Sequence, residues 1–199
     1  MNLESVINTS LNGTGDSDAH LMTLFGITIG IRAKTILELG VRGGTTTLPL
    51  LMAAKLTGGH VVSVDIDDTQ FVPPPELAPY WTFVKMDALQ YLKQLDKNIV
   101  QNLIYVDDWH SYEHVKSELE EIDKCVSPSS VVLLHDLMYG NYTPRYHSDL
   151  TDNAGAQWSH GGPYRAVAEL PGQFWEFSTI PVCNGLTILR KKYSNKYHI

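Results

Sequence analysis

The chain has 199 residues, 43% of them hydrophobic, which suffices for one buried core but is short for two domains. Its formal charge of -7 makes a nucleic-acid partner unfavourable. The two cysteines have neither paired nor metal-binding spacing, so a disulfide framework and a cysteine-based zinc site are not indicated. The N-terminus is polar and no apolar run is long enough to span a bilayer. We therefore expect one cytoplasmic domain over residues 1–199, with residues 1–15 as an N-terminal extension.

Five apolar segments have the length of β-strands. They lie at 34–39, 60–66, 80–85, 102–107 and 130–136, and apolar residues occupy both alternating positions within them. Continuous apolarity indicates burial on both faces, which is typical of parallel strands covered by helices. The sequence therefore predicts an α/β sandwich with a mostly parallel sheet.

Helices are expected between these strands. The segment 18–31 places apolar side chains on one helical face, with Asp16 or Ser17 positioned to cap it. The segment 45–56 has Pro49 near its start and a Gly-Gly pair after its end, both favourable for a helix. The segment 111–125 carries Val, Leu and Ile at helical spacing, with acids and lysines on the other face.

Two connections depart from a simple strand–helix alternation. Four prolines between the second and third strands predict a short or absent crossover helix there. Residues 137–163 show no apolar period, which favours a substrate lid, and six of their aromatic side chains would suit an acceptor-binding wall: Tyr139, Tyr142, Tyr146, His147, Trp158 and His160. A surface flap is the alternative for that segment.

The C-terminal part of the chain completes the predicted sheet. A helix at 163–170 is followed by strand candidates at 174–179 and 185–191, joined by a turn-rich segment. This pattern predicts an antiparallel hairpin at the sheet edge. The expected fold is α/β and Rossmann-like, a doubly wound, mostly parallel seven-stranded sheet with an antiparallel C-terminal hairpin.

A glycine turn follows the first strand in "ILELGVRGGTTT". The strand ends near Glu38, and Gly40, Gly43 and Gly44 precede a helix, so bare backbone and helix N–H groups lie at the carboxyl end of the strand. Open α/β sheets bind ligands there. A dinucleotide site would need a glycine at the position of Arg42, whose side chain would obstruct a pyrophosphate. This argues against a nicotinamide-dependent oxidoreductase.

The same turn, followed by Asp65 at the end of the second strand, resembles the class I methyltransferases that use S-adenosylmethionine. The resemblance covers residues 15–136 and implies that the turn packs on the methionine part of the cofactor. It also implies that Asp65 accepts the ribose hydroxyls and that Asp87 meets the adenine amino group; a carboxylate is a suitable acceptor for a vicinal diol. A tight connection and a solvated cap are the alternatives. The implied cofactor-binding residues are Glu38, Gly40, Gly43, Gly44, Thr45, Asp65, Asp87 and Trp109.

A second group of polar residues ends the fourth and fifth strands, in "IYVDDWHSYEHV" and "LLHD". It resembles the catechol-type O-methyltransferases, and more closely the branch near the macrocin O-methyltransferases and cephalosporin hydroxylase-like proteins. The resemblance implies Asp107 and Asp136 as metal ligands, Trp109 as an adenine contact and His110 as the base. Two positions depart from the catechol-type pattern, Leu137 for an amide ligand and His110 for a lysine. His135 would favour a transition metal over magnesium.

Methyl transfer to a neutral hydroxyl needs a base or a metal. His110 would supply the base, and the dipole of the following helix should keep its pKa below about 6.5. Alternatively, His110 and Ser111 only cap the helix, Asp107 is a solvated strand end and Trp109 packs at the sheet rim. His114, one turn further on, is expected at the surface.

The sequence thus predicts an S-adenosylmethionine-dependent methyltransferase, with Asp107 and His110 catalytic and Mg²⁺ or another divalent metal as a second cofactor. The acceptor would be a hydroxyl of a small molecule. We expect no nucleic-acid or membrane partner and leave open whether the protein forms a homodimer. The alternatives are a cofactor-binding protein without transfer activity and another metal-dependent enzyme of the same fold.

Overall fold

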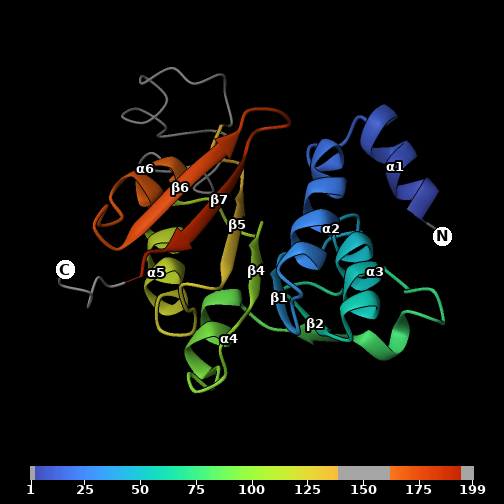
Figure 1. Ribbon diagram of the computed structural model, residues 1–199, viewed down its shortest axis with the longest axis horizontal. Helices are drawn as coiled ribbons and strands as arrows, with labels where there is room; N and C mark the ends of the chain where they lie inside the picture. Colours follow the sequence, from blue (N-terminus) through green and yellow to red (C-terminus); the bar gives the residue numbers. More distant parts are fainter. Residues whose placement is uncertain (1–2, 139–161, 194–199) are drawn as a thin grey trace.

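The computed structural model describes residues 3–138 and 162–193, which build a seven-stranded sheet in the order β3-β2-β1-β4-β5-β7-β6 (Figure 1). The first five strands are parallel, and β7 is antiparallel to both β5 and β6. The predicted Rossmann-like fold and its closing hairpin are confirmed. The strands are β1 (Thr35–Leu39), β2 (His60–Asp65), β3 (Trp81–Lys85), β4 (Leu103–Val106), β5 (Val131–His135), β6 (Trp175–Ile180) and β7 (Leu186–Lys191).

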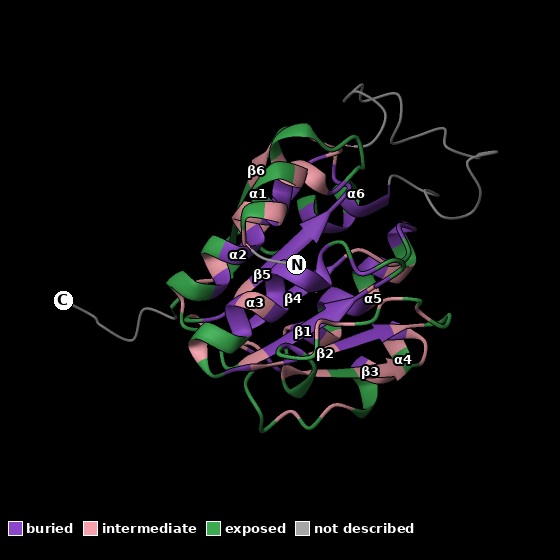
Figure 2. Cartoon of the chain, turned by 90° about the vertical axis from the view of Figure 1, so that its right-hand side faces the viewer, coloured by how far each residue is buried: buried purple, intermediate pink, exposed green. Residues whose placement is uncertain are grey.

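Helices cover both faces of the sheet (Figures 1 and 2). Neighbouring residues of one strand enter opposite cores: Ile36 packs with α1–α3, whereas Leu37 packs with α4–α6. This explains the continuous apolarity of the strands. The helices are α1 (Leu3–Asn12), α2 (Leu21–Gly30), α3 (Thr47–Thr57), α4 (Ala88–Gln94), α5 (Tyr112–Ile122) and α6 (Gly162–Ala168), with short 3-10 turns η1 (Asp18–His20) and η2 (Ala78–Tyr80).

The connections follow the local sequence. Helix α3 ends at Gly58, whose φ of +66° is a left-handed conformation that glycine adopts without strain. Between β2 and β3 the described chain has η2 and no α-helix, as the four prolines predict. The strand order reverses between β1 and β4, so the segments after these two strands lie side by side at the switch point of the sheet.

The starts of three helices differ from those expected from the sequence. The expected cap of the second helix is wrong, because α2 begins after His20 and Ser17 makes no capping hydrogen bond. Residues 3–12 of the expected N-terminal extension form α1, whose Val6 is buried in the core. Helix α4 was not among the expected helices; its N-cap is Asp87, which accepts the backbone N–H of Gln90.

The proposed lid lies largely beyond the described part of the chain. The six aromatic and histidine residues expected to wall the acceptor all fall in 139–161, so their role stays a prediction. The same holds for the assignment of residues 1–199 to a single domain. No helix in the described ranges is both long enough and apolar enough to cross a bilayer.

Candidate active site

The glycine turn packs directly on the segment that follows β4. Gly40 has a φ of +88°, and a Cβ there would lie 2.1 Å from the backbone oxygen of Asp107. Gly44 has a φ of +76° and faces the ring of Phe71, whereas a Cβ at Gly43 would meet no atom within 4 Å. Gly40 therefore makes the close approach between the turn and the acidic segment, while Gly44 serves packing.

Glu38 lies beneath this turn. Its carboxylate is fully buried and accepts the hydroxyl groups of Thr46, Thr47 and Ser63 at 2.8, 2.8 and 2.6 Å. Burial raises the pKa of Glu38 to about 7, although the three hydroxyl donors oppose this. Glu38 lines none of the cavities beside the turn. The structure thus places Glu38 in a supporting position beneath the turn, and its expected contact with a cofactor stays a prediction.

Asp65 holds the other side of the turn. Its Oδ2 accepts the backbone N–H groups of Val41 and Arg42 at 2.8 and 3.0 Å, and its Oδ1 accepts that of Asp67 at 3.0 Å. Partial burial opposes ionisation, but these backbone donors outweigh it and lower the pKa of Asp65. The carboxylate is therefore charged at neutral pH and faces a cavity at the carboxyl ends of the strands.

This cavity has a volume of about 410 Å³, within the range of small-molecule sites. It brings together four of the eight predicted cofactor contacts, since its wall includes Gly40, Asp65, Asp87 and the half-exposed Trp109. Gly43 and Thr45 line a neighbouring cavity of about 240 Å³. Gly40, Arg42 and Asp107 belong to both walls, so the two cavities meet at the turn.

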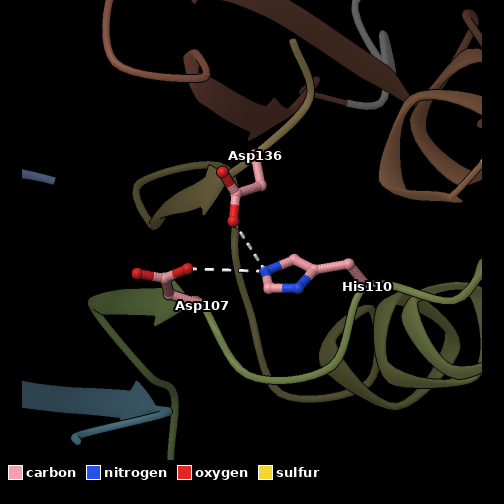
Figure 3. A group of neighbouring side chains, drawn as sticks. All are labelled: Asp107, His110 and Asp136. Carbon is pink, nitrogen blue, oxygen red and sulfur yellow. Dashed lines mark ion pairs between the residues drawn. The ribbon is translucent and has the colours of Figure 1, made fainter. Parts of the chain in front are cut away.

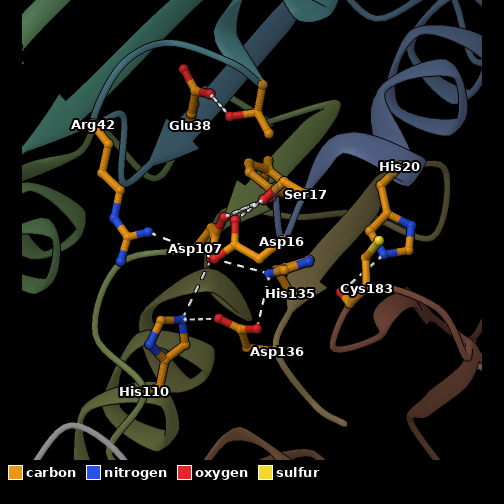
Figure 4. A network of polar contacts seen from close by, with 12 residues as sticks. Asp16, Ser17, His20, Glu38, Arg42, Asp107, His110, His135, Asp136 and Cys183 are labelled. Atoms are coloured by element: carbon orange, nitrogen blue, oxygen red, sulfur yellow. Dashed lines mark hydrogen bonds and ion pairs between the residues drawn. The ribbon is translucent and has the colours of Figure 1, made fainter. Parts of the chain in front are cut away.

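Two acids and two imidazoles form a closed ring beside these cavities (Figure 4), and Figure 3 shows three of these residues, Asp107, His110 and Asp136. His110 Nε2 lies 3.0 Å from Asp136 Oδ2 and 3.5 Å from Asp107 Oδ1. His135 Nδ1 lies 3.2 Å from Asp136 Oδ1 and 3.4 Å from Asp107 Oδ1. Asp107 and His110 follow β4, His135 ends β5 and Asp136 follows it, and these two strands are neighbours in the sheet. We call them the Asp–His ring.

The Asp–His ring is largely withdrawn from solvent, and its members fix one another's charge. Burial favours the neutral acids, but the two histidines outweigh it and lower the pKa of both Asp107 and Asp136. Burial would also lower the pKa of the histidines, yet the carboxylates raise those of His110 and His135 to about 9 and about 10. The predicted depression of the His110 pKa is therefore wrong, because two carboxylates act on it more strongly than the helix dipole.

The backbone helps to aim one of these acids. Asp136 has a φ of +65°, a left-handed conformation that costs a non-glycine residue about 1 to 2 kcal/mol. Such strain is typical of functional positions. Its N–H donates to the oxygen of Gly185, which ties β5 to the turn before β7.

Three residues outside the expected set support the Asp–His ring. Tyr105 donates its hydroxyl to Asp107 Oδ2 at 2.9 Å, and Ser17 approaches the same oxygen at 3.4 Å. The ring of His20 meets that of His135 edge-on at 5.4 Å. Ser17 and His20 precede β1 in the chain, so no local spacing could have linked them to Asp107 or His135.

The expected alternatives are resolved in part. Ser111 does cap α5, accepting the N–H of His114, whereas His110 turns to the acids. Asp107 is no solvated strand end, because its side chain is 20% exposed and has partners on both oxygens. His114 was expected at the surface, but it is largely covered and pairs with Asp108 and Glu118.

The donor set of the Asp–His ring fits a divalent cation. Ligand atoms of Asp107, His110 and Asp136 lie within 4.8 Å of one another. Oδ1 of Asp136 is buried and, apart from the ion pair with His135 Nδ1 at 3.2 Å, makes no hydrogen bond among the described residues, so it can accept a bond to an ion. Mixed imidazole and carboxylate ligands suit a transition metal better than magnesium.

Comparison with protein families gives a match over residues 37–137, half of the chain, to a family described as "Methyltransferase domain". The human protein N-terminal asparagine amidohydrolase is 28% identical over 146 residues, 71% of this chain and 44% of that protein. The pig protein of the same name is 26% identical over 137 residues, 66% of this chain and 42% of that protein. The chain thus spans less than half the length of these curated relatives.

Solved structures of methyltransferases share the fold. The O-methyltransferase TomG of Streptomyces achromogenes, in complex with S-adenosylmethionine, superposes with a TM-score of 0.66 at 19% identity, covering 89% of this chain and 81% of that one. An O-methyltransferase of Bacillus cereus in complex with S-adenosylhomocysteine gives 0.63 at 17% identity, covering 96% and 90%. The S-adenosylhomocysteine-bound methyltransferase of Podospora anserina gives 0.61 at 16% identity, covering 87% and 78%.

Proposed function

The chain belongs to the methyltransferase-domain family, and from this membership we propose that it transfers a methyl group from S-adenosylmethionine to a hydroxyl oxygen of a small molecule. One observation carries the proposal. Asp107 lines the cavity beside Asp65 and also belongs to the Asp–His ring, so the cofactor cavity and the candidate chemistry adjoin.

The 410 Å³ cavity is the proposed cofactor site. Its charged Asp65 would accept the ribose hydroxyls, and the half-exposed Trp109 would lie against the adenine. Asp87 keeps one oxygen on the N-terminus of α4, which leaves the other for the adenine amino group. The glycine turn admits the methionine part, because Gly43 leaves open space at its Cβ position. Bound there, S-adenosylmethionine would supply the methyl group as a sulfonium.

We place the transfer chemistry at the Asp–His ring. Asp107 and Asp136 stay ionised and, with His135, would hold a divalent cation, which lowers the pKa of an acceptor hydroxyl. His110 would take the hydroxyl proton at Nε2. It can do so only when neutral, and the carboxylates that raise its pKa are the groups that a cation would engage. The metal and the base thus act together.

A matched assay tests this proposal. Release of S-adenosylhomocysteine is measured over a panel of phenols, catechols, sugars and hydroxylated acids, with and without divalent metal. His110→Ala should lower the transfer rate by about 100- to 10,000-fold while leaving cofactor affinity nearly unchanged. His60→Ala is the control, because His60 begins β2 at the opposite edge of the sheet, is hydrogen-bonded to Thr82 and lines neither cavity. A His110→Ala variant as fast as the wild type would remove His110 from the mechanism.

A second candidate, amide hydrolysis, is favoured by the similarity to the N-terminal asparagine amidohydrolases. The Asp–His ring could equally activate a water molecule through a bound metal. Cys125 is poorly suited as a thiol nucleophile for this reaction, because burial raises its pKa. Ammonia release from peptides with N-terminal asparagine, in the absence of S-adenosylmethionine, would favour this candidate. Cofactor binding without either reaction would favour a non-catalytic binding protein.

A further inference from the structure

A second group of metal-ligating side chains lies beside the 410 Å³ cavity, two of them on its wall, and shares no residue with the Asp–His ring. His114 Nε2 is 2.9 Å from Asp108 Oδ2 and 3.4 Å from Glu118 Oε1. One ligand atom from each residue lies within 4.8 Å of the others. Metal–ligand distances of about 2.0–2.2 Å place neighbouring ligand atoms roughly 3 to 3.5 Å apart. The distances from His114 to both acids match this spacing.

The burial of Glu118 is a second, independent observation that indicates a bound ion. Its side chain is fully buried, and among the described residues its two oxygens form no hydrogen bond, so the 3.4 Å ion pair of Oε1 with His114 is the main contact that offsets their burial. Oδ1 of Asp108 is likewise buried and forms no hydrogen bond among those residues. No lysine or arginine of the described ranges pairs with either acid. A single imidazole nitrogen therefore faces two carboxylates, which leaves buried oxygen atoms without the partners that such atoms normally have.

We propose that Asp108, His114 and Glu118 bind a divalent transition-metal ion. One imidazole and two carboxylates suit Zn²⁺, Mn²⁺, Fe²⁺ or Co²⁺, whereas Mg²⁺ and Ca²⁺ prefer oxygen ligands throughout. Asp108 and His114 line the cavity and Glu118 does not. Glu118 would therefore hold the ion from the interior, and the remaining coordination positions would open only toward the cavity. The ion would thus lie on the wall of the proposed cofactor site.

The experiment counts bound Co²⁺ by equilibrium dialysis and records its visible absorption. Asp136→Asn first disables the Asp–His ring, so that an ion bound elsewhere is counted alone. In this background we expect one Co²⁺ per chain. Adding Glu118→Gln should lower the affinity for Co²⁺ at least 100-fold, whereas adding Glu120→Gln, at an exposed acid on the same helix, should leave it unchanged.

Circular dichroism verifies that each variant is folded, and His114→Gln replaces Glu118→Gln if the latter is not. The proposal is overturned if the Asp136→Asn protein binds no Co²⁺, or if its affinity for Co²⁺ is unchanged by the folded cluster substitution, which is Glu118→Gln or, in its place, His114→Gln. A comparison of wild type with Asp136→Asn reports separately on the Asp–His ring. Failure of the metal in the proposed function would therefore leave this test intact.

Discussion

Asp65 serves both the glycine turn and the proposed ligand, because its carboxylate accepts two N–H groups of the turn and faces the cavity. Asp65→Ala removes this acceptor, so we expect S-adenosylhomocysteine to bind about 1 to 3 kcal/mol more weakly, roughly 5- to 150-fold. Asp68→Ala, an exposed acid three residues on that lies outside the cavity wall, is the control. Equal affinity of the Asp65→Ala variant and the wild type in calorimetry would contradict the ribose assignment.

Glu38 gives a pH dependence that can be measured without any ligand. Its pKa is about 7 in the folded chain against 4.5 as the ordinary value, so folding favours the protonated form. The stability that this contributes is complete below pH 4.5 and is lost as the pH rises through 7. We expect the free energy of unfolding to fall over this interval by up to about 3 kcal/mol on account of Glu38 alone.

Glu38→Gln should abolish that part of the pH dependence, because an amide does not titrate. The measurement is denaturant unfolding of wild type and variant from pH 4.5 to 8, and the difference between the two curves isolates Glu38 from the other titrating groups. A constant difference across this range would mean that burial does not shift the pKa of Glu38.

At the scale of elements, the turn between β1 and α3 depends on one close backbone approach. Gly40→Ala would bring a Cβ within 2.1 Å of the Asp107 backbone oxygen and force a left-handed residue, which we expect to cost more than about 2 kcal/mol of stability. It should also displace Asp107 and weaken cofactor binding. Gly43→Ala, where a Cβ meets no atom within 4 Å, should change stability by less than about 0.5 kcal/mol.

Thermal and denaturant unfolding of the two variants checks this contrast. Similar losses of stability in both variants would show that packing of the turn against the segment after β4 does not determine which of its glycines can be replaced by alanine. The two variants also distinguish two roles of glycine in this turn. Gly40 is needed for a left-handed backbone in close contact with Asp107, whereas Gly43 only leaves open space where a side chain would stand.

At the scale of the whole molecule, the sheet could be predicted because its determinants are local. Every residue of a strand such as β1 faces one of two cores, so Ile36 and Leu37 are both apolar. The prolines before β3 and the glycine after α3 likewise act on their own backbone. Because these strands are parallel and adjacent, the sequence also predicted that the segments after β1, β2 and β4 meet at one edge of the sheet.

The parts of the site that could not be predicted depend on distant partners. Ser17 turns from the expected cap to Asp107, 90 residues away in the chain. The pKa of His110 is set by Asp136 as well as by its own segment, so the helix dipole alone predicts the wrong direction. Spacing within one segment carries no information on such contacts. A local contact was also missed: the acids of α5 were expected together on its outer face, yet Glu118 is fully buried and pairs with His114 one helical turn away.

The central claim is that the cavity beside Asp65 and the glycine turn is a cofactor site for S-adenosylmethionine. Calorimetric titration of the wild-type protein with S-adenosylhomocysteine tests it most directly, with NAD as the matched nucleotide control. We predict one site per chain with micromolar affinity, about -8 kcal/mol, and no binding of NAD. The absence of heat with S-adenosylhomocysteine, or tighter binding of NAD, would contradict the account.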